Sequence, residues 1–283
     1  MSAPTLINGL SDVADRYDAI LCDVWGVVHN GRESWPEACE ALTRFQETRG
    51  PVVLISNAPR PSKAVTAQLQ QLGVPHAAWS RFVTSGDATR AALAERAPGP
   101  VWVIGPPRDE ALFEGLDLQR SGPGEAAFIC CTGLVNDDVE TPEDYVERLR
   151  APASRGLEMI CANPDRVVQK GDSLIYCAGA VADVYAGLGG RVIMEGKPYA
   201  PIYELALREA GDPDRRKVLA IGDAIATDVK GASDQDIDCL WVAEGIHTAE
   251  LANDRGDLDP AKAETLLSRE GARARYLAPR LVW

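Results

Sequence analysis

The sequence predicts an α/β protein whose core is Rossmann-like, a doubly wound parallel sheet into which a second α/β domain is inserted. Apolar runs of strand length alternate with segments of helical periodicity. These runs are continuously apolar, which is typical of parallel strands that are covered on both faces. The alternation restarts between Pro/Gly-rich stretches in the middle of the chain. We therefore expect a core domain formed by residues 1–86 and 190–283 and an inserted domain formed by residues 87–189.

The first part of the chain alternates between strand and helix. The first two expected helices have proline near their start and glycine at their end. In chain order we expect a strand at 19–22, a helix at 34–50, a strand at 51–57, a helix at 61–73, a strand at 81–86 and a helix at 87–96. This order implies parallel strands that are joined by right-handed crossovers.

The middle and last parts of the chain repeat this alternation. The insert has apolar runs of its own, at 101–105, 126–131 and 157–162, and Pro/Gly-rich stretches at 97–100 and 121–124. The core resumes with a helix at 199–210 and strands at 217–223 and 238–243. We predict no role for the charged tail that follows residue 257.

The composition is that of an ordinary globular protein, since 46% of the 283 residues are hydrophobic and 25% are charged. The net charge of -13 disfavours nucleic acid and anionic membranes as partners, because both attract basic surfaces. Seven cysteines without a CxxC pair indicate buried thiols in a reducing cytosol. The N-terminus shows no signal-peptide pattern, and no apolar stretch approaches the roughly 20 residues of a membrane helix. We therefore expect a cytoplasmic protein.

Three aspartates suggest a catalytic and metal-binding site. Asp23 ends a buried strand, at the edge where open α/β sheets bind ligands, and could be a nucleophile that forms an aspartyl phosphate. Asp223 and Asp228 lie at the end of another buried strand and in the turn after it. Asp23 and Asp223 on adjacent strands would supply the carboxylates that Mg²⁺ prefers. Taken alone, a strand-terminal aspartate such as Asp23 is more often a turn or cap residue, and helix capping by Asp228 explains the pair of Asp223 and Asp228 equally well.

Two further segments offer groups that bind phosphate oxygens. Ser56 and Asn57 follow the second strand, where a hydroxyl and backbone N–H groups can hold a phosphoryl group. Lys197 precedes a helix and could neutralise the nucleophile and the phosphoryl group together. Each segment alone is more often a plain turn or a solvated loop. All of these segments, including the three aspartates, lie at strand ends or helix starts. Unrelated turn and cap residues would not be expected to show this shared placement.

Together these segments resemble the motifs of the haloacid dehalogenase (HAD) superfamily. They are Asp23-Val24-Trp25-Gly26-Val27, Ser56-Asn57, Gly196-Lys197-Pro198 and Gly222-Asp223 with Thr227-Asp228. The long insert, with Thr84-Ser85-Gly86 and Cys161-Ala162-Asn163-Pro164-Asp165, resembles subfamily IIA, the NagD-like and p-nitrophenyl-phosphatase-like phosphatases. The resemblance implies that residues 87–189 form an α/β cap domain of the kind that this subfamily carries.

The resemblance also implies a role for each motif residue. Asp23 would be the nucleophile and a Mg²⁺ ligand, and Lys197 would balance charge. The backbone carbonyl of Trp25 and the side chain of Asp223 would be further ligands, and Asp228 would support the metal through water or hydrogen bonds. The residues expected to contact the substrate are Ser56, Asn57, Trp25, Asn163 and Asp165.

One position departs from the family pattern. Phosphatases of this superfamily carry a second aspartate two residues after the nucleophile, as general acid and base, and here that position is Trp25. General acid–base help is typically worth about 10²–10⁴-fold in rate. His29 is the nearest titratable candidate in the sequence, although a histidine in a surface loop is the more frequent case.

Three functions therefore remain open. The first is a Mg²⁺-dependent phosphatase or phosphotransferase that acts on a small phosphorylated metabolite. The second is a phosphate-ligand binding protein that has lost efficient turnover. The third is a carbon–halogen hydrolase, which would share an aromatic residue at the position of Trp25 but would not need the metal that Asp223 and Asp228 suggest. A homodimer is plausible, and we expect the cap to close on hinges near Ser85-Gly86 and Gly189-Gly190.

Overall fold

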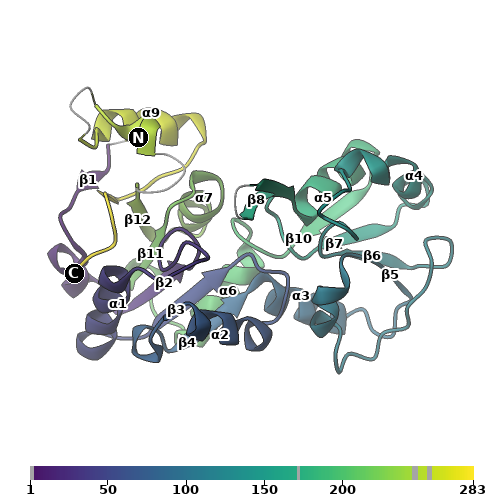
Figure 1. Cartoon of the computed structure of the whole chain (residues 1–283), viewed down its shortest axis with the longest axis horizontal. Helices are drawn as coiled ribbons and strands as arrows, with labels where there is room; N and C mark the ends of the chain where they lie inside the picture. The colour runs from purple at the N-terminus through teal and green to yellow at the C-terminus, as the bar shows by residue number, and fades with distance from the viewer. Residues whose placement is uncertain (1–2, 171–172, 244–247, 254–256) are drawn as a thin grey trace. The chain divides into compact units, whose positions relative to one another are not determined.

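The computed structural model describes residues 3–170, 173–243, 248–253 and 257–283, which divide into two compact units. The core unit comprises Met1–Ser56, Val65–Val83 and Tyr203–Trp283, and the inserted unit comprises Asn57–Ala64 and Thr84–Ile202. Each unit combines a parallel sheet with helices (Figure 1). This confirms the predicted class, an α/β protein with a Rossmann-like core and a second α/β unit within its sequence.

The core unit is built on a seven-stranded sheet in the order β1-β13-β12-β11-β2-β3-β4. The strand pairs whose register is described run parallel. The central strands β2 and β11 are buried along their whole length, as their continuous apolar sequences predict. The strands are β1 Thr5–Leu6, β2 Ala19–Asp23, β3 Val52–Ser56, β4 Arg81–Thr84, β11 Val218–Gly222, β12 Asp238–Val242 and β13 Tyr276–Ala278.

Three helices of the core unit, α1, α2 and α6, lie close to their predicted positions. α1 (Pro36–Thr48) has proline in its first turn and buries an apolar face that includes Leu42 and Phe45. α2 (Ser62–Gln71) follows Pro61 and ends before Gly73. The others are α6 Ala200–Glu209, α7 Lys230–Asp234, α8 Thr248–Leu251 and α9 Pro260–Arg269.

The C-terminal tail, for which the sequence predicted no role, extends the core sheet. β13 lies between β12 and β1 and pairs Tyr276 with Leu240 on one side and with Thr5 on the other. The strands β1 and β13 have 2 and 3 residues, too few for an alternating pattern to indicate a strand. Tertiary pairing therefore creates both strands.

The inserted unit has a four-stranded parallel sheet of its own, in the order β10-β7-β6-β5. Successive residues of β6 pack on opposite faces: Ile129 joins an apolar cluster with α4 and α5, and Phe128 joins one with Leu93 of α3. An antiparallel hairpin joins β8 and β9. The elements are α3 Ser85–Ala94, β5 Val101–Ile104, β6 Phe128–Cys131, α4 Val146–Ser154, β7 Glu158–Cys161, β8 Val167–Lys170, β9 Ser173–Tyr176, α5 Ala178–Gly187 and β10 Arg191–Met194.

The compact units differ from the predicted domain boundaries at both ends of the insert. β10 falls in the predicted core domain, but it pairs with β7 along Arg191–Met194 in the inserted sheet. At the other end Ser85 begins α3, and its buried hydroxyl lies 2.9 Å from the carbonyl oxygen of Ala58 and 2.6 Å from that of Ala162. Both differences arise from tertiary contacts that no local sequence pattern indicates.

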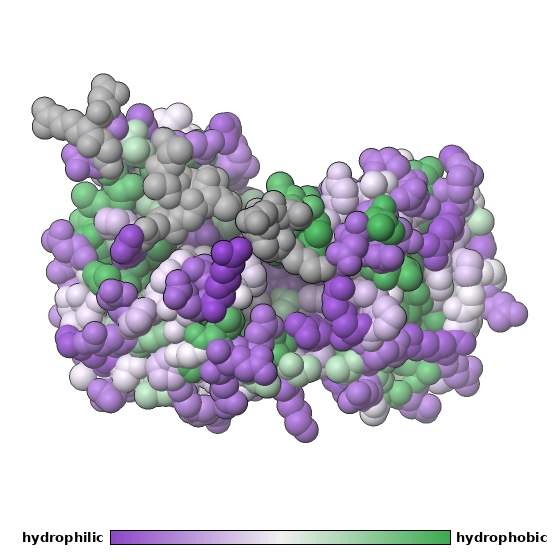
Figure 2. All heavy atoms as spheres, in the orientation of Figure 1, coloured by the Kyte–Doolittle hydropathy of each residue, from purple (hydrophilic) through white to green (hydrophobic). Residues whose placement is uncertain are grey.

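The described surface and the cysteines agree with the composition. Hydrophilic residues cover most of the face that Figure 2 shows. No helix within the described residues combines the length and the apolarity that a membrane crossing requires. All seven cysteines are buried, as the absence of a CxxC pair predicted.

Candidate functional site

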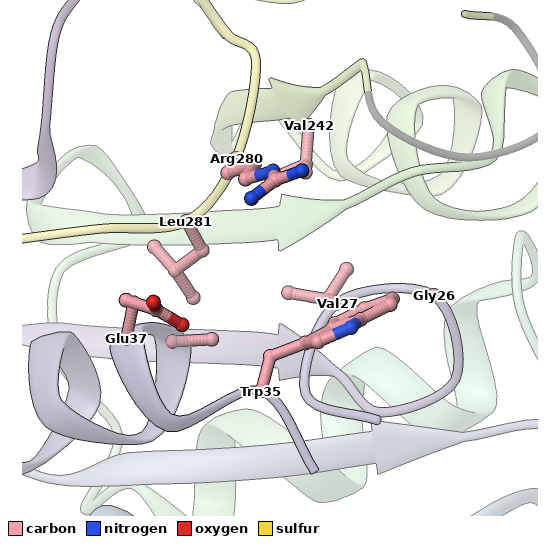
Figure 3. A pocket seen from close by; sticks show the side chains of 8 residues that line it. Gly26, Val27, Trp35, Glu37, Val242, Arg280 and Leu281 are labelled. Carbon is pink, nitrogen blue, oxygen red and sulfur yellow. The ribbon is translucent and has the colours of Figure 1, made fainter. Parts of the chain in front are cut away.

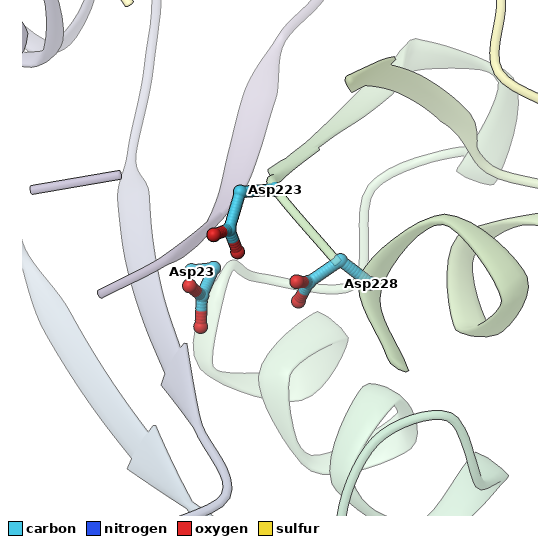
Figure 4. Close-up of side chains that lie close together, drawn as sticks. All are labelled: Asp23, Asp223 and Asp228. Atoms are coloured by element: carbon cyan, nitrogen blue, oxygen red, sulfur yellow. The ribbon is translucent and has the colours of Figure 1, made fainter. Parts of the chain in front are cut away.

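Three carboxylates meet at the C-terminal edge of the core sheet. Asp23 ends β2, Asp223 follows β11, and Asp228 lies in the helical turn Ile225–Val229 that comes next. Because β2 and β11 are parallel neighbours, with Cys22 opposite Ile221, their carboxyl ends share one edge. Each aspartate offers one oxygen, and these oxygens lie within 4.8 Å of one another (Figure 4). The structure thus brings together the three aspartates that the sequence singled out, which we call the acid cluster.

Two glycines allow the backbone to approach the acid cluster closely. A Cβ atom on Gly26 would lie 2.2 Å from Oδ2 of Asp223, and the φ of +89° at Gly26 favours glycine as well. A Cβ atom on Gly222 would lie 2.2 Å from the Cβ atom of Asp228. Backbone therefore fills the space beside both carboxylates.

The acid cluster fits a hard divalent cation. All its donor atoms are carboxylate oxygens, which are the ligands that Mg²⁺ and Ca²⁺ prefer. Asp23 and Asp228 are buried, and converging buried carboxylates repel one another unless a positive charge is close. Asp228 also accepts a hydrogen bond from the backbone N–H of Ala224 at 3.2 Å, so the capping role that the sequence left open is present too. These residues can hold a metal.

The loop after Asp23 places Trp25 and His29 together. The two rings meet edge to face with centroids 5.3 Å apart. His29 is buried, so the interpretation as a surface loop histidine is wrong. Burial lowers the pKa of His29 to about 4, and its Nδ1 accepts a hydrogen bond from the backbone N–H of Gly31 at 3.0 Å. His29 is therefore neutral near pH 7 and holds no extra proton that a general acid could donate.

A second polar cluster forms around Lys197 inside the inserted unit, and we call it the lysine cluster. The side-chain amide of Asn57 accepts from the backbone N–H of Lys197 at 2.7 Å and donates to the carbonyl oxygen of Lys197 at 3.1 Å. The same amide donates to the carboxylate of Asp165 at 2.9 Å. Asn163 accepts from the backbone N–H of Asp165 at 3.0 Å. Four residues predicted from the sequence, up to 140 positions apart, therefore lie in one cluster.

The lysine cluster is also built around a glycine. A Cβ atom on Gly196 would lie 2.5 Å from Oδ1 of Asn57 and 2.6 Å from Cδ of Pro164. Asn57 and Lys197 are buried. Ser56, the last residue of β3, immediately precedes Asn57.

Glu195 is a buried acidic residue that the sequence analysis gave no role. Burial raises its pKa to about 7, while the charge of Arg96 lowers this pKa and the charges of Glu95 and Glu158 raise it. The available signal was an acidic residue directly after the apolar run of β10. Its carboxyl group changes charge near neutral pH, two residues before Lys197.

A small pocket of about 170 Å³ lies in the core unit, next to the loop that carries Trp25. Apolar residues, together with Glu37 and Arg280, line it (Figure 3). Gly26 lines the pocket and also abuts Asp223. Sequence reasoning did not find this pocket, because Arg280 belongs to the tail for which it predicted no role.

Comparisons with known proteins identify haloacid dehalogenase-like hydrolases as relatives of this chain. Residues 20–119 match a family described as haloacid dehalogenase-like hydrolase, and residues 194–267 match a second HAD-hydrolase-like family. A haloacid dehalogenase-like hydrolase from Brucella suis 1330, whose crystal structure is known, shares 47% sequence identity with this chain. The two structures match with a TM-score of 0.84, over 98% of this chain and 100% of that chain.

More distant relatives have named activities. The 5'-nucleotidase YutF of Bacillus subtilis is 27% identical, over 84% of this chain and 91% of its own length. The D-glycerol 3-phosphate phosphatase of Mycobacterium tuberculosis is 26% identical, over 85% of this chain and 67% of its own length. A 4-nitrophenylphosphatase structure from Thermotoga maritima shares the fold, with 20% identity, a TM-score of 0.72 and coverage of 95% of this chain and 96% of that chain.

Proposed function

The chain belongs to the haloacid dehalogenase-like hydrolases, and from this premise we propose that it is a Mg²⁺-dependent phosphatase that forms an aspartyl phosphate on Asp23. The acid cluster carries this proposal. It places Asp23, at the end of β2, within 4.8 Å of two further carboxylates, which one cation could neutralise together with a phosphoryl group. Relatives that are named as phosphatases of nucleotides and of glycerol phosphate support a small phosphorylated metabolite as the substrate.

We assign the metal to Asp23, Asp223 and Asp228 together with the backbone carbonyl of Trp25. When bound, Mg²⁺ would offset the negative charge of the carboxylates and of the phosphoryl group. A related glycerol phosphate phosphatase structure from Mycobacterium tuberculosis, which shares the fold at 23% identity, was determined in complex with calcium. That cation likewise prefers oxygen ligands.

The proposed reaction has two displacement steps at phosphorus. A carboxylate oxygen of Asp23 forms a bond to phosphorus while the bond to the leaving-group oxygen breaks, and the electron pair departs with that oxygen. Water then forms a new P–O bond and loses a proton, the bond to Asp23 breaks, and inorganic phosphate leaves. Asp23 recovers its carboxylate at the end of the second step.

We assign the phosphoryl oxygens to Ser56 and to the backbone of Asn57, and the balancing positive charge to Lys197. The side-chain amide of Asn57 accepts a hydrogen bond from the N–H of Lys197 and donates one to its carbonyl oxygen, which supports a coordinated role for Asn57 and Lys197. We assign Asn163 and Asp165, in the same cluster, to contacts with the substrate.

Trp25 is the observation that favours a second function, the binding of phosphate ligands without efficient hydrolysis. A side chain without an acidic proton at this position favours slow turnover, and a protein that binds phosphate ligands without hydrolysing them would carry the same residues. A carbon–halogen hydrolase is less well supported, because the acid cluster fits a metal that such an enzyme does not use.

Release of inorganic phosphate tests the proposal. A panel of phosphate esters is incubated with the protein, with and without Mg²⁺, beside the Asp23→Asn variant. We expect release that requires Mg²⁺ and falls about 10⁴-fold or more in the variant, because the nucleophile is lost. Binding of phosphate esters without release above the variant would favour the binding protein. Release of halide from haloacids without a metal would favour the third function.

A further inference from the structure

Trp25 is an exposed aromatic residue in the loop that follows Asp23 of the acid cluster. The residue remains 42% exposed. A single exposed apolar side chain is common in itself, but the position of this one is specific. Trp25 follows Asp23 by two residues, and its neighbour Gly26 abuts the carboxylate of Asp223. The indole is therefore anchored on backbone that belongs to the candidate catalytic site.

The indole is held by packing and does not depend on a ligand to order it. A Cβ atom on Gly31 would lie 2.3 Å from Cη2 of Trp25, so the absence of a side chain at Gly31 leaves room for the ring. The edge-to-face contact with His29, at an interplanar angle of 78°, supports the ring from another side. Hydrogen bonds from the N–H of Gly26 to the carbonyl of His29 and from the N–H of Val28 to that of Val24 close the loop.

A fixed, partly exposed indole favours a flat ligand. Aromatic pairs contribute about 0.5–1.5 kcal/mol beyond the burial of area, and a ring that is already ordered loses little entropy when another ring stacks on it. The indole N–H has no acidity that could protonate a departing oxygen. Trp25 can therefore bind a leaving group but cannot donate the proton that a poor leaving group needs.

We propose that Trp25 is the specificity-determining residue of this site and selects phosphate esters of acidic, planar hydroxyl groups, which are aryl or heteroaryl phosphates. The ring of the leaving group stacks on the exposed indole. When the bond between phosphorus and the ester oxygen breaks, the electron pair stays on that oxygen as a phenolate-type anion, which picks up its proton from water after it departs. The inference rests on the proposed function, because it names the substrate class of the same site.

Binding tests the stacking without turnover. Phenylphosphonate and cyclohexylphosphonate have rings of similar size, but only the first is flat, and neither is hydrolysed. With Mg²⁺ present, we expect the wild type to bind phenylphosphonate about 2- to 10-fold more tightly. Trp25→Phe should retain most of this preference and Trp25→Leu should lose it. Equal binding of the two ligands to the wild type, or an unchanged preference in Trp25→Leu, would overturn the assignment.

The dependence of kcat/KM on the leaving group tests whether the site lacks a general acid. In a series of aryl and alkyl phosphates, kcat/KM of the wild type should fall steeply as the pKa of the leaving group rises. Trp25→Asp introduces a carboxyl group at the same position and should raise kcat/KM for alkyl phosphates by up to about 10²–10⁴-fold, with a much smaller gain for aryl phosphates. The slope of log kcat/KM against the leaving-group pKa should therefore become shallower.

The outcomes distinguish this inference from the proposed function. A flat dependence on leaving-group pKa in an active wild type would contradict the inference and leave the phosphatase intact. Absence of release from every ester in every variant, with the phenylphosphonate preference preserved, would contradict the phosphatase and support Trp25 as the binding platform. Circular dichroism of each variant shows whether it has folded. Where Trp25→Leu does not fold, the wild-type preference for phenylphosphonate over cyclohexylphosphonate and the leaving-group series with Trp25→Asp carry the test.

Discussion

The acid cluster and the lysine cluster both contain buried polar residues, but different kinds of contact position these residues. In the core unit, Asp23 and Asp223 come together because two parallel strands end at the same edge of one sheet. In the inserted unit, Lys197 is positioned by the side chain of Asn57, which contacts its backbone at two points. Sheet register therefore positions the carboxylates, whereas a single buried amide positions the lysine. The comparison predicts that backbone changes disturb the first cluster and side-chain changes disturb the second.

Among the changes that test this comparison, the largest effect should come from Gly26→Ala. The new Cβ atom would collide with the Asp223 carboxylate at 2.2 Å, and Ala would have to adopt a φ of +89°. We expect a loss of activity of about 10²-fold or more, because small displacements of catalytic groups cost this much. Phosphate release and Mg²⁺ affinity measure the effect.

Gly211→Ala is the matched control. Gly211 has a φ of +90°, but nothing lies within 4 Å of the Cβ position. This variant should lose only about 1–2 kcal/mol of stability from the backbone conformation and keep its activity. Equal loss of activity in the two variants would show that strain, and not contact with Asp223, explains the result at Gly26.

An intermediate effect is expected from Asn57→Ala. The change removes the partners of a buried N–H, a buried carbonyl and a carboxylate, and each buried group left without a partner costs about 1–3 kcal/mol. We expect a loss of about 3 kcal/mol or more in the free energy of unfolding in urea, together with a large fall in kcat, because Lys197 loses its support.

Asn136→Ala provides a comparison within the same unit. Asn136 is an exposed loop residue whose amide oxygen accepts one hydrogen bond, from the N–H of Asp138 at 3.3 Å. Its loss should cost less than about 1 kcal/mol and leave activity unchanged. If Asn57→Ala were as mild as this control, the side-chain amide would not position Lys197.

A smaller, pH-dependent effect is expected at Glu195. Its pKa is raised to about 7 in the folded protein, from 4.5 when unfolded, so the folded state holds the proton more tightly. The stability it contributes is complete below pH 4.5 and is lost as the pH rises through about 7. Glu195→Gln removes this loss, so its stability relative to the wild type should increase by about 2 kcal/mol between pH 5 and pH 8.

Urea unfolding at the two pH values measures this change. Glu125→Gln, at an exposed position of the inserted unit, is the control and should follow the wild type at both. A Glu195→Gln variant whose stability runs parallel to that of the wild type from pH 5 to pH 8 would show that the buried carboxyl group does not titrate in this range.

The sequence predicted the features that local patterns determine. Apolar runs predicted β2 and β11, and the rule that neighbouring parallel strands end at one edge of a sheet predicted that Asp23 lies near Asp223. The burial of His29 was not predictable, because it depends on how the loop folds back on Trp25. The pairing of β10 with β7 was missed for a similar reason, since four residues show no pattern of their own.

The lysine cluster was predicted only in part. The resemblance to a family pointed to Asn57, Lys197, Asn163 and Asp165 as separate substrate and charge-balancing residues. It did not reveal that the Asn57 side chain binds the backbone of Lys197, because that contact spans 140 positions of the chain. Residue types were therefore readable from the motifs, whereas the bonds that position them required the fold.

Direct detection of the phosphorylated residue tests the central claim. The protein is mixed with Mg²⁺ and an aryl phosphate, quenched in acid within the first turnover, and digested for mass spectrometry. We expect a phosphoryl group on the peptide that contains Asp23 and none in the Asp23→Asn variant. Phosphate release that continues without a phosphoryl group on Asp23, or with one on a different residue, would contradict the assignment of Asp23 as the nucleophile.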